Sequence, residues 1–272
     1  MIEEGRLLSR HGFTKTNSWI TIVISALLML AGAVLFLFLL TAERAEDDRV
    51  QFTLLAGMAC IVLGITLMFL RHLIKPKQIY QLHENGILVI NQHDQKDHFI
   101  PFEKICDIYR YRSGNYTGKL INALAFRTDI YSAWNKISPN VAGSARLIEV
   151  IINQQLIHRG PAALTMLAND GHVSFFYLCP SRSLLKRVLS RNFWMMKEKQ
   201  LRLSALSLST EDQMIPIDEV HHIVSGGPGE PIELLDAQDR VLFSIPYMSL
   251  FSADLFIALI EHMIQSRIPI RT

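Results

Sequence analysis

Residues 19–42 read WITIVISALLMLAGAVLFLFLLTA, and residues 50–70 read VQFTLLAGMACIVLGITLMFL. Neither stretch contains a charged residue. A bilayer core about 30 Å thick is crossed by about 20 apolar residues at helical rise, so each stretch is long enough to span it with some tilt. The connector between them, ERAEDDR, leaves room only for a turn. The sequence therefore predicts a transmembrane helical hairpin over residues 19–71.

Two other interpretations of these stretches fit the composition less well. A cleaved signal peptide has an apolar region of about 7–15 residues that ends at a small-residue cleavage site. The first stretch is longer, and no A-x-A site follows it. A buried hairpin of a soluble protein normally carries a polar stripe at helical period, and neither stretch shows one. Either close helix approach or the ordinary composition of membrane helices explains a set of small residues: Ala31, Gly32, Ala56, Gly57 and Gly64.

Basic residues flank the outer ends of this hairpin more than they flank its turn. Orientation follows lysine and arginine near the membrane rather than net charge. We therefore expect both outer ends on the cytoplasmic side and the acidic turn on the far side. The outer basic residues are Arg6, Arg10, Lys15, Arg71, Lys75 and Lys77, against Arg44 and Arg49 in the turn.

The composition bounds what the rest of the chain can be. The chain has 272 residues, is 50% hydrophobic and carries a formal net charge of +2. About 200 residues outside the hairpin suffice for one large domain or two small ones. The near-neutral balance gives no argument for a nucleic-acid partner. Cys60, Cys106 and Cys179 have no paired spacing, which fits a reducing compartment better than a disulfide framework.

Beyond the hairpin the hydrophobic pattern changes to short β-type runs. Asn85-Gly86 is a strong hairpin-turn signal between two such runs. Further helices are predicted at residues 144–159, with Ser144 as N-cap, at 161–169 after a break at Gly160-Pro161, and at 252–264. Residues 131–143 are predicted to be a loop. The predicted strands are 78–82, 87–91, 98–102, 105–111, 120–129, 172–178, 201–208, 213–217, 220–224, 232–235 and 241–245.

A short pattern occurs twice in the β-rich part. Residues 100–105 read IPFEKI, and residues 215–220 read IPIDEV. Proline is tolerated at a strand end, and the following acid and apolar residues can return the chain to the sheet. The pattern indicates either an internal duplication, with two related β domains in tandem, or a chance match.

Together with the hairpin, these strand pairs resemble bacterial membrane proteins with pleckstrin-homology-like (PH-like) domains. The resemblance implies seven-stranded barrels, each capped by a C-terminal helix, and it supplies no catalytic residues. The helix-rich insert at residues 131–168 departs from that pattern. Most members of this group have no known function. The matching residues are 80–91, 100–108, 201–223 and 252–264.

The predicted fold class is therefore a membrane-anchored α+β protein, with an N-terminal transmembrane hairpin followed by two PH-like β-barrel domains that each carry helical additions. The predicted location is the bacterial inner (cytoplasmic) membrane, with a multi-pass chain whose N-terminus and C-terminal domains are cytoplasmic. The predicted domains are a cytoplasmic lead (1–18), the hairpin (19–71), a first PH-like domain with a helical insert (78–181), a basic connecting helix (182–200) and a second PH-like domain (201–272).

Candidate catalytic and metal sites are poor. His221 and His222 are adjacent on a predicted strand, so they point to opposite faces and cannot both hold one ion. The cluster His93, Asp94, Asp97 and His98 lies in a turn, where polar side chains are expected in any case. The glycine-rich residues 226–229 lack the lysine and the following helix of a phosphate-binding loop. We therefore predict no catalytic residue, no metal site and no cofactor.

The basic stretch before the last β block offers a binding surface. Its cations and tryptophan can rest on the anionic cytoplasmic leaflet, at about 1 kcal/mol per cation. The other interpretation is a connecting helix with a solvated basic face, whose apolar residues 184, 185, 188 and 189 pack inward. The candidate membrane-surface or partner contacts are Lys186, Arg187, Arg191, Trp194 and Lys197.

The function predicted from these patterns is non-enzymatic binding of a protein or lipid partner at the inner membrane. The expected partners are the membrane itself, a protein such as a toxin or a membrane complex, and anionic lipid, but not nucleic acid. An immunity protein that neutralises a toxin is one version of this function. The alternative class is an enzyme with a pocket in the helical insert that uses Arg127, Asp129 and His158. A channel is disfavoured because the two helices contain no ionisable residue.

Overall fold

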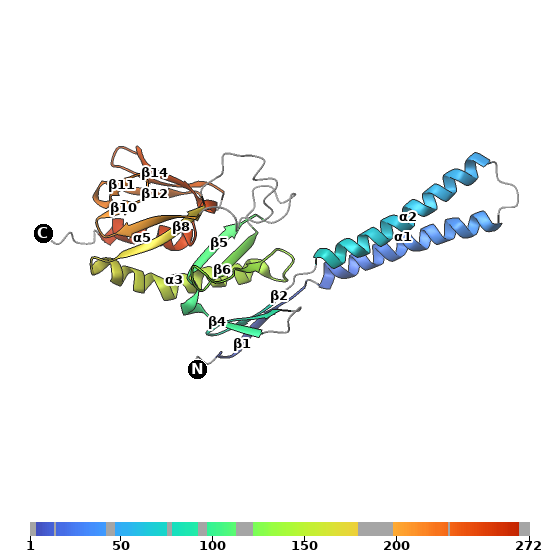
Figure 1. The fold of residues 1–272 in the computed structure, drawn as a ribbon, viewed down its shortest axis with the longest axis horizontal. Coiled ribbons are helices and arrows are strands. Elements are labelled where there is room, and N and C mark those ends of the chain that lie inside the picture. The colour runs from blue at the N-terminus through green and yellow to red at the C-terminus, as the bar shows by residue number, and fades with distance from the viewer. Residues whose placement is uncertain are drawn as a thin grey trace.

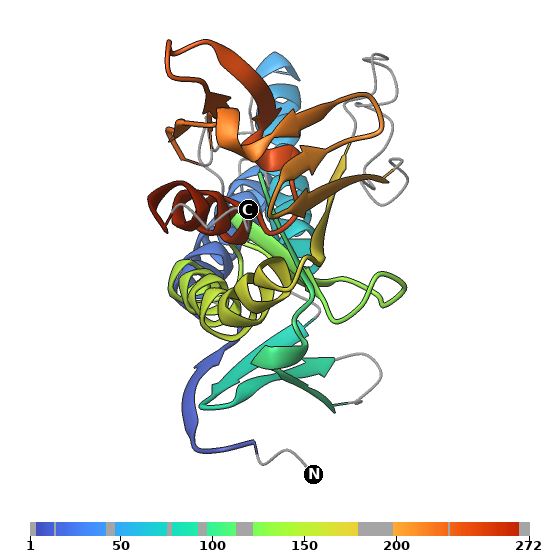
Figure 2. The ribbon, with the colours of Figure 1, turned by 90° about the vertical axis from the view of Figure 1, so that its left-hand side faces the viewer.

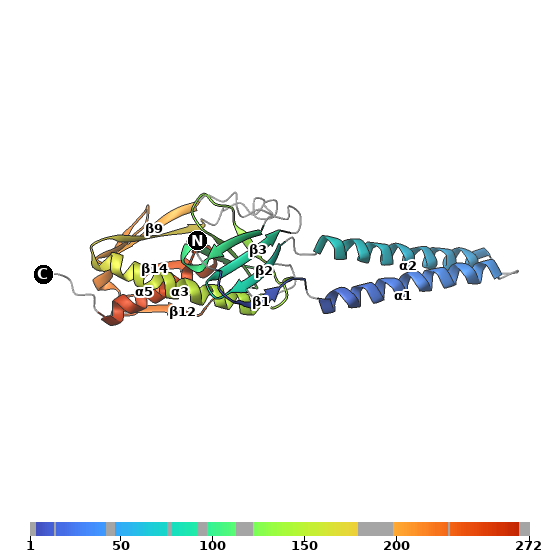
Figure 3. The ribbon, with the colours of Figure 1, turned by 90° about the horizontal axis from the view of Figure 1, so that it is seen from below.

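A computed structural model describes residues 4–13, 15–41, 47–74, 78–91, 97–112, 122–178, 198–227 and 229–266. Two long helices, α1 (Lys15–Thr41) and α2 (Asp47–Ile74), extend away from a head of β-sheets and helices (Figure 1). Seen from below, α1 and α2 lie beside each other along their length, and β1 and β2 run toward their base (Figure 3). The prediction of two long apolar helices and an α+β head is confirmed.

The apolar stretches of the two helices are exposed rather than buried. Residues 19–39 and 50–70 are long and apolar enough to cross a membrane, and only 11% of each hydrophobic window is buried. The core helix of a soluble protein would bury most of such a window. The exposure therefore disfavours the buried hairpin of a soluble protein.

Small residues lie where α1 and α2 touch. A Cβ atom added at Gly32 would lie 2.8 Å from the carbonyl oxygen of Gly57 and 2.6 Å from a side-chain carbon of Ile61. A Cβ atom at Gly64 would lie 3.0 Å from the carbonyl oxygen of Ser25. The two contacts lie two helical turns apart on each helix, as expected for antiparallel helices that pack through small residues. Close approach is thus the interpretation that the structure supports for these glycines.

Gly32→Ile is expected to lower the free energy of unfolding of the detergent-solubilised chain by about 1–3 kcal/mol, because the new side chain overpacks the helix contact. Ala33→Ile is the matched control, since Ala33 follows on the same helix and is exposed. Denaturant titration followed by far-UV circular dichroism measures both variants. Equal stability of the two variants would contradict the close contact.

The first β unit consists of two antiparallel sheets and the N-terminal half of a long helix. One sheet has the order β1-β2-β3-β4, and the other has the order β5-β6-β7. Tyr80, Phe102 and Phe126 are among the largest side chains of its core. The elements are β1 (Leu7–His11), β2 (Gln78–His83), β3 (Gly86–Asn91), β4 (Asp97–Pro101), the 3-10 turn η1 (Phe102–Lys104), β5 (Asp107–Tyr111), β6 (Ala123–Arg127), β7 (Asn135–Ile137) and α3 (Ser144–Ala168).

Strand β1 precedes the helical hairpin in sequence and still belongs to the head. It pairs antiparallel with β2, with His11 opposite Tyr80. Residues 7–11, expected in an N-terminal lead, thus form an edge strand. The helical hairpin is inserted between the first and second strands of the first β unit. The sequence LLSRH does not alternate apolar and polar residues as a half-buried strand does. In the structure, four of its five residues are partly or fully exposed.

The second β unit repeats this plan. Its sheets have the orders β11-β10-β9-β8 and β12-β13-β14. Strand β8 falls in the range predicted for the first domain, yet it pairs with β9 along its whole length. The elements are β8 (His172–Leu178), β9 (Glu198–Ser204), β10 (Ser207–Ser209), β11 (Met214–Pro216), η3 (Ile217–Glu219), β12 (His222–Ser225), β13 (Pro231–Leu235), β14 (Val241–Pro246), η4 (Tyr247–Ser249) and α5 (Ala253–Ser266).

The repeated sequence pattern corresponds to a repeated backbone shape. Pro101 and Pro216 share a φ of −62°, with ψ of 143° and 134°, and each starts a 3-10 turn. A third copy of the shape follows Pro246, with φ −59° and ψ 127°, where residues 245–250 read IPYMSL. In both units, a four-stranded sheet, a 3-10 turn, a three-stranded sheet and a helix follow in the same order.

Helix α3 connects the cores of the two units. We expected it to end at Gly160, but it continues through Pro161 to Ala168. Proline removes a hydrogen bond to the carbonyl four residues earlier, at Ile157, and Ile157 is 61% exposed, so water can reach that site. The first half of α3 packs in the first core and the second half in the second, and α3 lies beside α5 (Figure 2). Burial at both ends therefore outweighs the break.

Three smaller expectations also differ from the structure. Gly143, with φ of 66°, precedes the helix, and Ser144 is its first residue instead of a side-chain N-cap. Strand β7 lies in the predicted loop at 131–143. Residues 201–208 form parts of two strands. The alternation of apolar and polar residues shifts at Ala205, where the chain turns between β9 and β10.

Candidate functional site

A buried arginine joins the two β units. Arg127, at the end of β6, donates from Nε to Asp107 Oδ2 at 2.7 Å. Its two terminal nitrogens donate to the carboxylate of Glu198 on β9 at 3.2 and 3.1 Å. The Arg127 side chain is 3% exposed. Such a two-pronged contact fixes geometry as well as charge, so one guanidinium links the first unit to the second.

Aromatic rings enclose this guanidinium. Its central carbon lies 4.5 Å from the ring centre of Trp134, 5.3 Å from that of Phe251 and 5.7 Å from that of Phe176. These distances are within the range of cation–π attraction. Burial raises the pKa of neighbouring Tyr109 to about 12 and also raises the pKa of Asp107, which the hydrogen bond from Arg127 opposes. Arg127, its two carboxylate partners and these rings form a joint between the β units. This joint is a closed structural site rather than an open cleft.

A second set of polar contacts joins the units beside α5. Ser252 donates its backbone N–H to the carbonyl of Ile108 at 2.6 Å, and its hydroxyl accepts the N–H of Ile108 at 3.1 Å. Gln155 of α3 donates to the same hydroxyl at 2.9 Å. Arg110 donates to the hydroxyl of Tyr247 at 2.8 Å. These contacts hold the two β units together as one head.

The residues proposed for an enzyme in the helical insert do not converge. Arg127 is committed to the joint. Asp129 accepts the N–H of Tyr131 at 2.8 Å within a turn. His158 is exposed on α3, and its ring stacks on Phe102 at 6.4 Å between centroids. Each of the three side chains thus has a separate local role.

The remaining candidate residues are either outside the described part of the chain or exposed. The candidate contacts Lys186, Arg187, Arg191, Trp194 and Lys197 lie outside the described residues, as does Cys179. His222 is exposed on β12, and His221 is exposed just before it. Within the described ranges, no group of three His, Cys, Asp or Glu residues could hold a metal ion.

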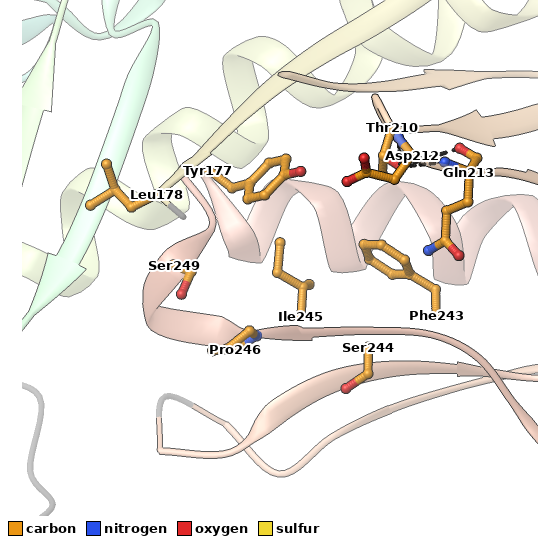
Figure 4. Close-up of a pocket in the computed structure, with 10 residues that line it drawn as sticks. All are labelled: Tyr177, Leu178, Thr210, Asp212, Gln213, Phe243, Ser244, Ile245, Pro246 and Ser249. Carbon is orange, nitrogen blue, oxygen red and sulfur yellow. Dashed lines mark hydrogen bonds between the residues drawn. The ribbon is translucent and has the colours of Figure 1, made fainter. Parts of the chain in front are cut away.

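The second β unit contains a pocket of about 230 Å³. Phe243 and Ile245 rise from β14 toward Tyr177 on β8, and the turn between β10 and β11 closes one end (Figure 4). Thr210 stabilises that turn, because its hydroxyl accepts the N–H groups of residues 212 and 213 at 3.2 and 3.0 Å. The lining residues are Tyr177, Leu178, Thr210, Asp212, Gln213, Phe243, Ser244, Ile245, Pro246 and Ser249.

An acidic rim lies at one end of the pocket, where Asp212 lines it and Glu211 is the neighbouring residue in sequence. The Lys199 ammonium lies 3.1 Å from the carboxylate of Glu211 and 3.4 Å from that of Asp212. The hydrogen bond to Glu211 raises the pKa of Lys199. Both carboxylates are more than half exposed, at 52% and 77%. The arrangement can therefore accept a further cation beside an apolar pocket.

Sequence reasoning gave no signal for this pocket. Tyr177, Phe243 and Ile245 occupy ordinary strand positions, and alternation assigns them to a core. The pocket lies between β8 and β14, which belong to different sheets, and the chain returns to β8 only after η4, where Leu250 forms a bridge with Tyr177. Only the packing of strands that are distant in sequence determines where β8 and β14 lie apart and leave a pocket.

No family model, no curated protein and no solved structure matches this chain. The resemblance to PH-like membrane proteins therefore stays a prediction. The hairpin, the joint and the pocket are the features of this chain that bear on its function.

Proposed function

We propose that this chain is a membrane-anchored, non-enzymatic binding protein. Its helical hairpin holds the head at the cytoplasmic face of a bacterial inner membrane, where the head recognises a protein or lipid partner. The two β units are PH-like domains in this proposal. Their repeated order of four strands, three strands and a helix supports that assignment.

One observation carries this proposal: both ends of the helical hairpin lead directly into one sheet. Strand β1 ends at His11 and α1 begins at Lys15, while α2 ends at Ile74 and β2 begins at Gln78. Each link spans at most about 14 Å even when fully extended. Because β1 and β2 are paired, the head stays against the same end of the hairpin and can meet only partners near that surface.

The proposal predicts that the full chain stays in the membrane pellet after an alkaline carbonate wash and needs detergent for extraction. In native membranes, a photo-crosslinking residue in place of Gln213, at the pocket, should form a specific adduct. The same residue in place of Gln238, in the exposed β13–β14 turn, is the control. Recovery of a monodisperse chain from plain buffer without detergent would contradict the anchor.

A further inference from the structure

We infer that the pocket between β8 and β14 binds an extended peptide segment, which places one large apolar side chain between Tyr177, Phe243 and Ile245 and a neighbouring lysine or arginine at the acidic rim. This inference rests on the proposed function as a binding protein and names the partner chemistry. It is carried by the size of the pocket, by the edge of β14 and by the charge of the rim.

The size of the pocket favours a single side chain as its occupant. A volume of about 230 Å³ corresponds to about eight water molecules. Pockets that enclose drug-sized small molecules are usually about 300–1,000 Å³. Phe243 and Ile245 are almost fully buried and form an apolar floor. One large apolar side chain therefore fits this space better than a whole cofactor does.

The edge of β14 beside the pocket offers main-chain hydrogen bonds. Strand β14 is the edge of its sheet, and Tyr247 donates its N–H to Glu230 on the β13 side at 3.4 Å. Alternate residues of an antiparallel strand direct their N–H and C=O groups to opposite sides. The backbone groups of Phe243 and Ile245 therefore face β13, and those of Ser244 face outward at the pocket.

The position of Pro246 agrees with this register. Pro246 lies opposite Pro231. Neither proline has an N–H, so this pair fits a position where the two residues exchange no hydrogen bonds. Addition of a peptide strand to a sheet edge, with a pocket for an alternate side chain, is a common mode of peptide recognition. Ser244 thus supplies main-chain contacts, and the floor of the pocket supplies selectivity.

The charge of the rim determines what flanks the apolar side chain. Glu211 and Asp212 share one cation, Lys199, and both carboxylates remain exposed to solvent. A peptide with a lysine or arginine next to its apolar residue would complete the neutralisation. An acidic peptide would be repelled. Because these charges are exposed, their contribution should fall as ionic strength rises.

The test is selection of phage-displayed random eight-residue peptides on the full-length chain in detergent. The expected result is enrichment of peptides with a large apolar residue beside lysine or arginine. Gln213→Trp, which puts a ring at the pocket mouth where the Gln213 side chain extends toward Phe243 (Figure 4), should weaken a selected peptide at least tenfold. Gln238→Trp, in an exposed turn of the same unit, should change its affinity less than twofold.

Asp212→Asn provides a second measurement, which separates charge from shape. It should weaken peptides with basic flanks severalfold and make their binding less dependent on salt. Failure to enrich peptides, or enrichment that Gln213→Trp leaves unchanged, would overturn the inference. Selection of acid-flanked peptides would overturn it as well. If the chain still pellets with membranes and crosslinks to a partner elsewhere, the proposed function stands without this peptide site.

Discussion

Replacing Arg127 with alanine is expected to destabilise the head by about 3–5 kcal/mol, the usual cost of breaking a buried ion pair by removing one partner. The substitution leaves the carboxylate of Asp107 buried without its guanidinium and empties the space beside the rings of Trp134 and Phe251. Denaturant titration of the detergent-solubilised chain, followed by tryptophan fluorescence, measures the change, because Trp134 lies against the altered site.

Arg202→Ala on β9 is the matched control, since Arg202 is exposed and the hydrogen bond described for its side chain is to Gln200. Exposed ion pairs and surface contacts contribute about 0–1 kcal/mol. Adding Asp107→Asn to the Arg127 variant should recover part of the loss, because the buried charge is removed. A loss below about 1 kcal/mol for Arg127→Ala would show that the joint is not a closed, buried site.

The sequence predicted the parts of this fold that depend on local signals. An uncharged apolar run at helical length has few other outcomes. The predicted hairpin does join β2 to β3, although Glu84 and Asn85 form its turn and Gly86 is the first residue of β3. The paired IPFEKI and IPIDEV segments predicted a repeated local structure, and both occur at the end of a strand and the start of a 3-10 turn. In each case the determining residues are neighbours in sequence.

The features that the sequence did not predict depend on interactions between residues that are far apart in the chain. Strand β1 has little apolar character, and its pairing with β2 exists only because the hairpin returns the chain to the same place. Helix α3 passes Pro161 because its two halves are buried in different cores. A pattern along one segment contains no information about a core that other segments build.

The joint escaped sequence reasoning for the same reason. From sequence, Arg127 is only a possible participant of an enzyme pocket, and it precedes the helix-rich insert at residues 131–168. Its partners, Asp107 and Glu198, lie on two other strands, one in each β unit. Burial turns these ordinary charged residues into a structural joint, and burial is a property of the assembled head alone.

The insertion of the helical hairpin between β1 and β2 determines where the head can be separated from the hairpin. A chain that begins at residue 78 keeps every helix and strand of the head except β1. It loses the hydrogen bonds between β1 and β2 and the bond from Ala142 to Gly12. At about 1 kcal/mol for each backbone hydrogen bond, the expected loss is about 4 kcal/mol, and β2 becomes an open edge that promotes aggregation.

A chain in which Asn-Gly replaces residues 14–77 is expected to behave in the opposite way. The β1–β2 pairing ends at His11 and Tyr80. Continued by two residues in the same register, it would bring Phe13 opposite Gln78, where a two-residue turn can close the strands. This chain should be monodisperse without detergent and should unfold cooperatively, whereas the chain that begins at residue 78 should aggregate. Size-exclusion chromatography and thermal denaturation compare the two. Equal behaviour would mean that β1 adds nothing to the head and that β2 alone attaches the helical hairpin to it.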